Sequence, residues 1–130
     1  MYKRQEWSER HLPSCRLLAR LENRIVGWAA LSPVSSRCVY GGVGEVSIYV
    51  ADGARGGGVG RQLLDALVKT SEENGIWTLQ AGIFPQNQAS IHLHQQAGFR
   101  IVGRRVRLGC MNGQWRDIVL MERRSAVVGV

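Results

Sequence analysis

One stretch, residues 43–61, constrains the fold more than any other part of the chain. It begins with an alternating apolar run, Val43–Ala51, and continues through a glycine-rich segment. The alternation predicts a strand with Ile48 on one face and Glu45 on the other. From Gly58 onwards the apolar residues recur at helical spacing, so a helix is expected directly after the glycines. Because the first backbone N–H groups of a helix have no partner within it, this junction predicts an anion site.

The rest of the sequence predicts one domain of the α+β (mixed α/β) class, a twisted sheet flanked by helices. The further elements expected are strands at Cys15–Leu21, Ile25–Leu31, Ile76–Phe84, Phe99–Leu108 and Trp115–Arg123, and helices over 58–74 and 87–97. Asn112-Gly113 is a strong signal for a hairpin between the last two strands. No repeat or linker divides residues 1–130. Residues 1–13 are expected to be irregular and residues 125–130 to form a loose tail.

Composition excludes several classes of protein. Hydrophobic residues make up 45% of the chain and charged residues 21%, which are ordinary values for a globular protein. No apolar run approaches the roughly 18 residues of a membrane span, and the polar first residues lack a signal-peptide core. A cytoplasmic protein without membrane contact is therefore expected. Cys15, Cys38 and Cys110 are odd in number and widely spaced, which argues against a disulfide framework and a metal site.

The formal net charge of +7 fits a phosphate-bearing cofactor, although charge alone does not choose among anions. No recognised nucleic-acid motif accompanies it, so nucleic acid is not an expected partner. The glycine-rich segment Arg55-Gly56-Gly57-Gly58-Val59-Gly60 lacks the G-x-x-x-x-G-K-(S/T) spacing of a P-loop. It also lacks the G-x-G-x-x-G fingerprint with a later acidic ribose ligand. Without further signals, a glycine turn that binds nothing remains an alternative.

Two motifs give this chain a resemblance to the GNAT superfamily of N-acetyltransferases. Arg55–Gly60 resembles the family's acetyl-coenzyme A signature, (Q/R)-x-x-G-x-(G/A), between a strand and a helix. Asn87–Phe99 resembles its N-x-x-(A/S)-x-x-L-(Y/H)-x-x-x-G-F helix, which flanks the pantetheine arm of the cofactor. The runs E-V-S-I-Y-V, A-G-I-F-P-Q-N, L-H-Q-Q-A-G-F and G-Q-W-R-D-I resemble the phosphinothricin acetyltransferase-like branch. This resemblance covers roughly residues 14–124.

The resemblance implies acetyl-CoA as cosubstrate and direct transfer of its acetyl group to the primary amine of a small amino-acid-like substrate. It further implies a set of cofactor-binding residues along the strand, the glycine segment and the second helix. These are Ile48, Tyr49, Val50, Arg55, Gly56, Gly57, Gly58, Val59, Gly60, Arg61, Asn87 and Ser90. The physical reading agrees, because an acyl carrier beside a strand can use main-chain hydrogen bonds while its pyrophosphate lies at a helix N-terminus.

Two residues are candidates for catalysis, and the sequence does not choose between them. Glu45 lies on the polar face of the central strand, and the resemblance implies a base, acting directly or through water. His94 falls where the branch carries histidine and where many relatives carry a tyrosine acid; histidine both accepts and donates protons near neutral pH. The alternatives are a surface or salt-bridged glutamate and a helix-face histidine bonded to a backbone carbonyl.

The front of the chain departs from the family pattern. GNAT domains have a strand and one or two helices before the hairpin seen here at residues 15–31, whereas about thirteen residues precede it in this sequence. Either the chain is truncated or a partner chain supplies the missing cover, and an uncovered apolar edge or face of the sheet favours a homodimer. Two alternative functions stay open: acetylation of a protein N-terminus or lysine, and a non-catalytic coenzyme A-binding or dimeric interaction module.

Overall fold

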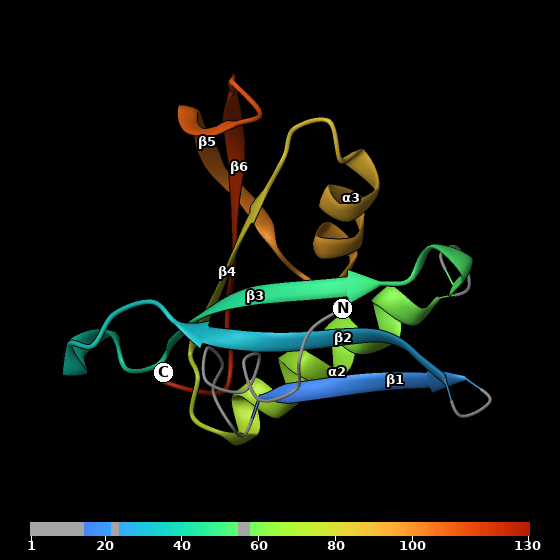
Figure 1. Cartoon of the computed structure of the whole chain (residues 1–130). Coiled ribbons are helices and arrows are strands. Elements are labelled where there is room, and N and C mark those ends of the chain that lie inside the picture. Colours follow the sequence, from blue (N-terminus) through green and yellow to red (C-terminus); the bar gives the residue numbers. More distant parts are fainter. Residues whose placement is uncertain (1–14, 22–23, 55–57) are drawn as a thin grey trace.

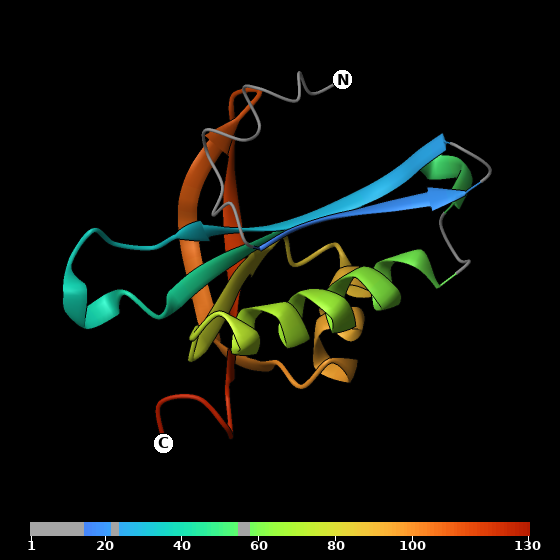
Figure 2. The ribbon, with the colours of Figure 1, turned by 90° about the horizontal axis from the view of Figure 1, so that it is seen from below.

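The computed structural model describes residues 15–21, 24–54 and 58–130. Within these ranges six strands form one sheet in the order β1-β2-β3-β4-β6-β5, and two α-helices cover one of its faces (Figures 1 and 2). The strands are β1 (Arg16–Leu21), β2 (Arg24–Pro33), β3 (Val43–Val50), β4 (Thr78–Ile83), β5 (Arg100–Met111) and β6 (Gln114–Arg124). The helices are α2 (Val59–Glu73) and α3 (Gln88–Gln96). The mixed sheet with flanking helices confirms the predicted α+β class.

The last hairpin forms as its sequence predicts. Asn112 and Gly113 have φ angles of 53° and 75°, which are the left-handed values required at both central positions of a type I′ turn. Residues 22–23 lie outside the described residues, and the antiparallel pairing of β1 with β2 confirms the predicted hairpin.

The core lies between the sheet and α2. Leu63, Leu64 and Leu67 are at most 4% exposed and pack with apolar residues of the strands, as the helical spacing predicts. Gly58, at φ 83°, precedes the helix, and Gly75, at φ 76°, follows its end. Neither α2 nor α3, the helices of the described ranges, is long and apolar enough to cross a membrane.

The expectation of a loose C-terminal tail needs correction. Residues 125–130 have no helix or strand, yet Ser125 is buried and its hydroxyl donates to Glu72 of α2. The same hydroxyl accepts hydrogen bonds from the backbone N–H groups of Val127 and Val128. Arg124 also donates to the Val128 carbonyl at 2.8 Å. The contact with Glu72 joins residues distant in sequence, so local composition did not predict it.

Candidate functional site

The central feature of the sheet is a fork between β3 and β4. The two strands run parallel and pair at Val43–Thr78, Gly44–Leu79 and Glu45–Gln80. Beyond the Glu45–Gln80 pair, β3 stays with β2 while β4 stays with β6, and the two strands diverge (Figure 1). The facing edges of β3 and β4 therefore separate at the point where Glu45 ends the pairing.

The backbone of β3 presents hydrogen-bonding groups to this fork. The N–H of Ala51 donates to the Val26 carbonyl at 2.7 Å, so the backbone of Ala51 faces β2. Because successive residues of a strand direct their N–H and C=O groups to opposite edges, those of Ile48 face the fork. Among the described strands, none pairs with this part of the edge. An extended ligand with amide groups can bind there as a strand would.

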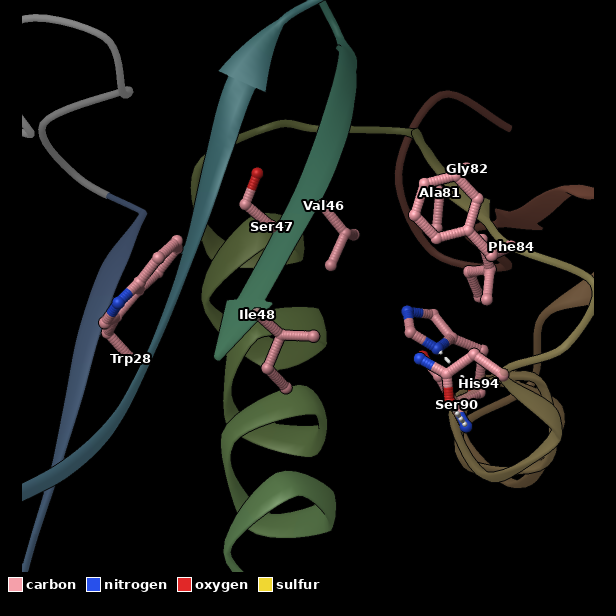
Figure 3. A pocket seen from close by; sticks show the side chains of 11 residues that line it. Trp28, Val46, Ser47, Ile48, Ala81, Gly82, Phe84, Ser90 and His94 are labelled. Carbon is pink, nitrogen blue, oxygen red and sulfur yellow. Dashed lines mark hydrogen bonds between the residues drawn. The ribbon is translucent and has the colours of Figure 1, made fainter. Parts of the chain in front are cut away.

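A cavity of about 330 Å³ fills the fork. Its lining comprises Trp28, Val46, Ser47, Ile48, Ala81, Gly82, Ile83, Phe84, Asn87, Ser90 and His94. Val46 and Ile48 point toward the helix side, where the ring of His94 lies, whereas Ser47 points away from it (Figure 3). The cavity thus has lining residues from both faces of the sheet, which lets two ligands meet from opposite sides.

His94 is held in one tautomer by α3. Its ring is 2% exposed, and its Nδ1 lies 2.8 Å from the carbonyl oxygen of Ser90. A carbonyl only accepts, so Nδ1 carries the hydrogen and the Nε2 of the neutral ring has a free lone pair. This Nε2 is buried and has no hydrogen-bond partner among the described residues. The ring of Phe99 packs edge-on against His94 at 5.0 Å.

Burial lowers the pKa of His94 from its usual value of 6.5, and the hydrogen bond to Ser90 opposes this shift. The neutral ring is therefore favoured near pH 7, with an unprotonated nitrogen in a ring that lines the cavity. One alternative raised by the sequence was a helix-face histidine bonded to a backbone carbonyl, and Nδ1 makes that bond. It leaves Nε2 available for chemistry.

Asn87 begins α3 as predicted. Its Oδ1 accepts a hydrogen bond from the Ser90 backbone N–H at 3.1 Å, which is an N-cap contact. This cap fixes the first turn of the helix and so places Ser90 and His94 along the cavity. Gly98, at φ 96°, follows the helix and allows the chain to turn into β5.

The start of α2 forms the second part of the predicted cofactor site. Gly58 has no side-chain cap, so the first N–H groups of the helix are not bound by a capping side chain. Val59 is buried in the core, and the side chain of Arg61 is exposed and pairs with Asp65 at 2.9 Å. The predicted residues Arg55, Gly56 and Gly57 lie outside the described residues.

Glu45 and Tyr49 lie on the face opposite the helices. Glu45 is exposed, and its Oε1 accepts a hydrogen bond of 3.3 Å from Gln80. Tyr49 is 49% exposed and its ring stacks on that of Trp28, with the ring centroids 6.3 Å apart. Neither Glu45 nor Tyr49 lines the fork cavity, whereas Ile48 does. Glu45 is therefore beside the fork rather than inside it.

Sequence reasoning missed several lining residues of the cavity. Trp28 comes from β2 and Phe84 from the end of β4, so only the sheet order brings them together. Phe84 before Pro85 marked the end of a strand, but the alternation of that strand does not reveal a cavity. The structure brings together Ile48, Asn87, Ser90 and His94 from the predicted set.

These features fit an acyl carrier such as acetyl-CoA. The open edge of β3 matches an extended chain with amide groups, and the uncapped start of α2 matches its phosphates. The unpartnered Nε2 belongs to the ring of His94, which lines the cavity together with Ile48 of that edge. Fold and site together define an acyl-CoA-dependent transferase. Within the described residues no group of three or more His, Cys, Asp and Glu side chains gathers to hold a metal ion.

Comparison with known proteins leads to the same class of enzyme. Residues 1–99 match the model of the acetyltransferase (GNAT) family. The chain is 36% identical over 118 residues to the L-amino acid N-acyltransferase MnaT of Escherichia coli, spanning 89% of this chain and 69% of that protein. The chain belongs to the GNAT family, and it is an acetyl-CoA-dependent N-acetyltransferase as predicted.

Two solved structures are close to this fold. A ribosomal-protein-alanine N-acetyltransferase from Brucella melitensis has a TM-score of 0.82 and 37% identity, covering 85% of this chain and 68% of that one. A phosphinothricin acetyltransferase from Sinorhizobium meliloti, solved with acetyl-CoA, has a TM-score of 0.81 and 31% identity, covering 88% and 62%. The match to the phosphinothricin acetyltransferase-like branch is confirmed. The chain spans about two thirds of the length of these relatives.

Proposed function

We propose that this chain transfers the acetyl group of acetyl-CoA directly to the primary amine of a small amino-acid-like acceptor in a ternary complex. The observation that carries the proposal is the fork cavity, which joins the open edge of β3 to the unpartnered Nε2 of His94. The E. coli relative is named for L-amino acids and the S. meliloti relative for phosphinothricin, an amino acid. These names support an acceptor of the same kind.

Cofactor binding follows from the two backbone surfaces. The backbone of Ile48, with Tyr49 and Val50 beside it, would hold the pantetheine arm, and Asn87 and Ser90 would contact it from α3. Gly58, Val59, Gly60 and Arg61, together with Arg55, Gly56 and Gly57, would hold the pyrophosphate. When bound, acetyl-CoA supplies a thioester whose acetyl group is reactive toward amines. Positioning both reactants at the fork supplies much of the rate.

His94 is the group best placed to handle protons. An amine attacks only when neutral, so a base must take the proton of the incoming ammonium group. The Nε2 of His94 has a free lone pair, and its Nδ1–H group donates to the backbone carbonyl of Ser90. His94 would accept the proton at Nε2 and then hold there the proton that the thiol product requires. The Ile48 backbone N–H, which faces the fork, would stabilise negative charge on the acetyl oxygen.

Glu45 is the second candidate base. Its carboxylate lies at the last β3–β4 pair on the face opposite the helices. From there it would act on an acceptor that enters from that face, directly or through a water. Because it does not line the cavity, we assign the first proton transfer to His94 and to Glu45 the attraction of an ammonium group.

A second function has one observation in its favour. The B. melitensis neighbour is named a ribosomal-protein-alanine N-acetyltransferase. The open face of the sheet near Glu45 would then receive the end of a polypeptide. The experiment is thiol release from acetyl-CoA with a panel of L-amino acids, phosphinothricin and alanine-ended peptides.

Turnover with free amino acids supports the first function, whereas turnover with peptides alone replaces it with the second. Acetyl-CoA binding without turnover of any amine would leave a non-catalytic coenzyme A-binding or dimeric interaction module.

We also propose a cytoplasmic homodimer. Leu18 and Tyr49 are 47% and 49% exposed on the face of the sheet that α2 and α3 leave open. A second copy would cover these apolar side chains. The exposed thiols of Cys38 and Cys110, which form no disulfide among the described residues, fit a reducing compartment. Light scattering of the purified chain at micromolar concentration tests the oligomeric state; a monomer would contradict it.

A further inference from the structure

A second cavity, of about 360 Å³, adjoins the fork cavity. It is lined by Phe84, Gln86, Asn87, Met111 and Arg116. Phe84 and Asn87 line both cavities, so the two spaces are neighbours on either side of these residues. Arg116 is the charged residue of this lining. It belongs to β6, a strand to which the proposed function assigns no role.

The side chain of Arg116 lies on the face of the sheet opposite the helices. Leu120 of β6 pairs with Gly82 of β4, so these two positions lie on the same face of the sheet. Arg116 precedes Leu120 by four residues and shares that face, because residues at even spacing in a strand do so. On this face a Cβ at Gly82 would lie 3.1 Å from Ile118, which fits the same alternation. Gly109 is the direct partner of Arg116 on β5 and adds no side chain there. The pairing thus leaves room beside Arg116.

The guanidinium of Arg116 has no counter-ion in the described part of the chain, whereas three other arginines of this hairpin do. Arg100 pairs with Glu122 at 2.7 Å, Arg104 with Asp117 at 2.7 Å and Arg123 with Glu72 at 3.6 Å. Arg116 is also half-buried. A half-buried cation loses hydration that an anionic ligand can replace. The planar guanidinium suits a carboxylate, which it binds through two parallel hydrogen bonds.

We propose that Arg116 forms a subsite for an anionic group of the acceptor, carried either by its α-carboxylate or by its side chain. This inference rests on the proposed function and further specifies the acceptor as one that carries an anionic group. The amine lies at the fork and the anion reaches past Phe84 to Arg116. The amide of Gln86 lines the same cavity, and Met111 gives it an apolar wall. A peptide N-terminus, which has no carboxylate near its amine, would lack this contact.

The test compares acceptors that differ only in charge. Steady-state acetylation is measured for the wild type and Arg116→Gln with the best L-amino acid, with its carboxamide and with phosphinothricin. Losing a charge-assisted hydrogen-bonded pair predicts a fall of about 10- to 100-fold in kcat/KM for the free amino acid, mostly through KM. The carboxamide should change by less than about twofold. Arg116→Lys keeps the charge and should recover part of the activity.

The matched control is Arg105→Gln, which removes the same charge from an exposed position on the neighbouring strand β5. It should behave as the wild type. A thermal shift with acetyl-CoA should be unchanged in both variants. A larger loss with phosphinothricin than with an amino acid of neutral side chain assigns Arg116 to the side-chain anion, and an equal loss assigns it to the α-carboxylate.

An equal loss with the amino acid and its carboxamide, or no loss with any of the amino acid, its carboxamide and phosphinothricin, overturns this inference while wild-type turnover keeps the proposed function. A lost acetyl-CoA shift in Arg116→Gln also overturns it, because the residue would then be structural. If the wild type turns over none of the small acceptors, both the Arg116 subsite and the proposed function are overturned. The wild-type measurements alone identify that outcome.

Discussion

Replacing His94 with glutamine tests the central chemical claim. The wild-type Nε2 is an unprotonated nitrogen, buried and without a partner among the described residues. The amide nitrogen of glutamine can donate but cannot accept a proton. General acid–base catalysis by a placed side chain contributes about 10²- to 10⁴-fold, which corresponds to about 3 to 5 kcal/mol of transition-state stabilisation. We therefore expect His94→Gln to lower kcat by that factor.

The assay is thiol release from acetyl-CoA across a range of pH. The pKa of His94 is lowered below 6.5, so the wild-type kcat/KM should fall only when the pH drops below about 6.5. His94→Gln should lack this acid limb. His92→Gln is the matched control, because His92 is exposed on the same helix. Circular dichroism and acetyl-CoA binding report whether the variants fold.

Two results would refute this reasoning. One is a kcat of His94→Gln within about threefold of the wild type, since a proton acceptor cannot be removed at so small a cost. The other is an acid limb that persists in His94→Gln and disappears in Glu45→Gln. That second outcome would assign the base to Glu45 and leave His94 a structural residue packed on Phe99.

Three further outcomes follow from particular contacts. Gly27→Ala would put a Cβ 2.7 Å from the backbone oxygen of Tyr49, so urea unfolding should show a loss of about 1 to 3 kcal/mol. Asn87→Ala removes the cap on α3 and should cost about 0.5 to 2 kcal/mol in the same assay, with weaker acetyl-CoA binding by calorimetry. Unaltered stability would contradict either expectation. The lowered pKa of His94 means that its contribution to stability is complete above pH 6.5 and is lost as pH falls through the folded-state pKa. Unfolding at pH 7.5 and 5.5 should therefore differ less in His94→Gln than in the wild type, and an equal difference would count against the burial argument.

Local patterns in the sequence predicted the strands and helices well. The alternation of Val43–Ala51, the apolar stripe of α2 and the Asn112-Gly113 turn depend on neighbours in sequence, and each forms as expected. The Asn87 cap is likewise local, because it needs only the Ser90 N–H. Local physics therefore identified the elements that carry the site.

The geometry of the site needed the sheet order. The divergence of β3 from β4 after Glu45 depends on which other strands each prefers, which no single segment encodes. For the same reason Arg116 gave no signal: between Trp115 and Asp117 it is one more arginine in a basic strand. The anchored tail depends on a contact between Ser125 and Glu72, which are distant in sequence.

The fork also explains why the two candidate catalytic residues lie on opposite faces. In a fully paired sheet, side chains on the two faces are separated by the backbone and cannot act on one reacting atom. Here the paired region ends at Glu45, and beyond it the cavity has lining from both faces. His94 therefore approaches the reacting atoms from the helix face, while the acceptor enters from the face of Glu45 and Arg116. If that division is right, Arg116→Gln should alter KM for the acceptor and His94→Gln should alter kcat, because each acts from its own face. A double variant should then lose the product of the two factors, since residues that share no partner act additively.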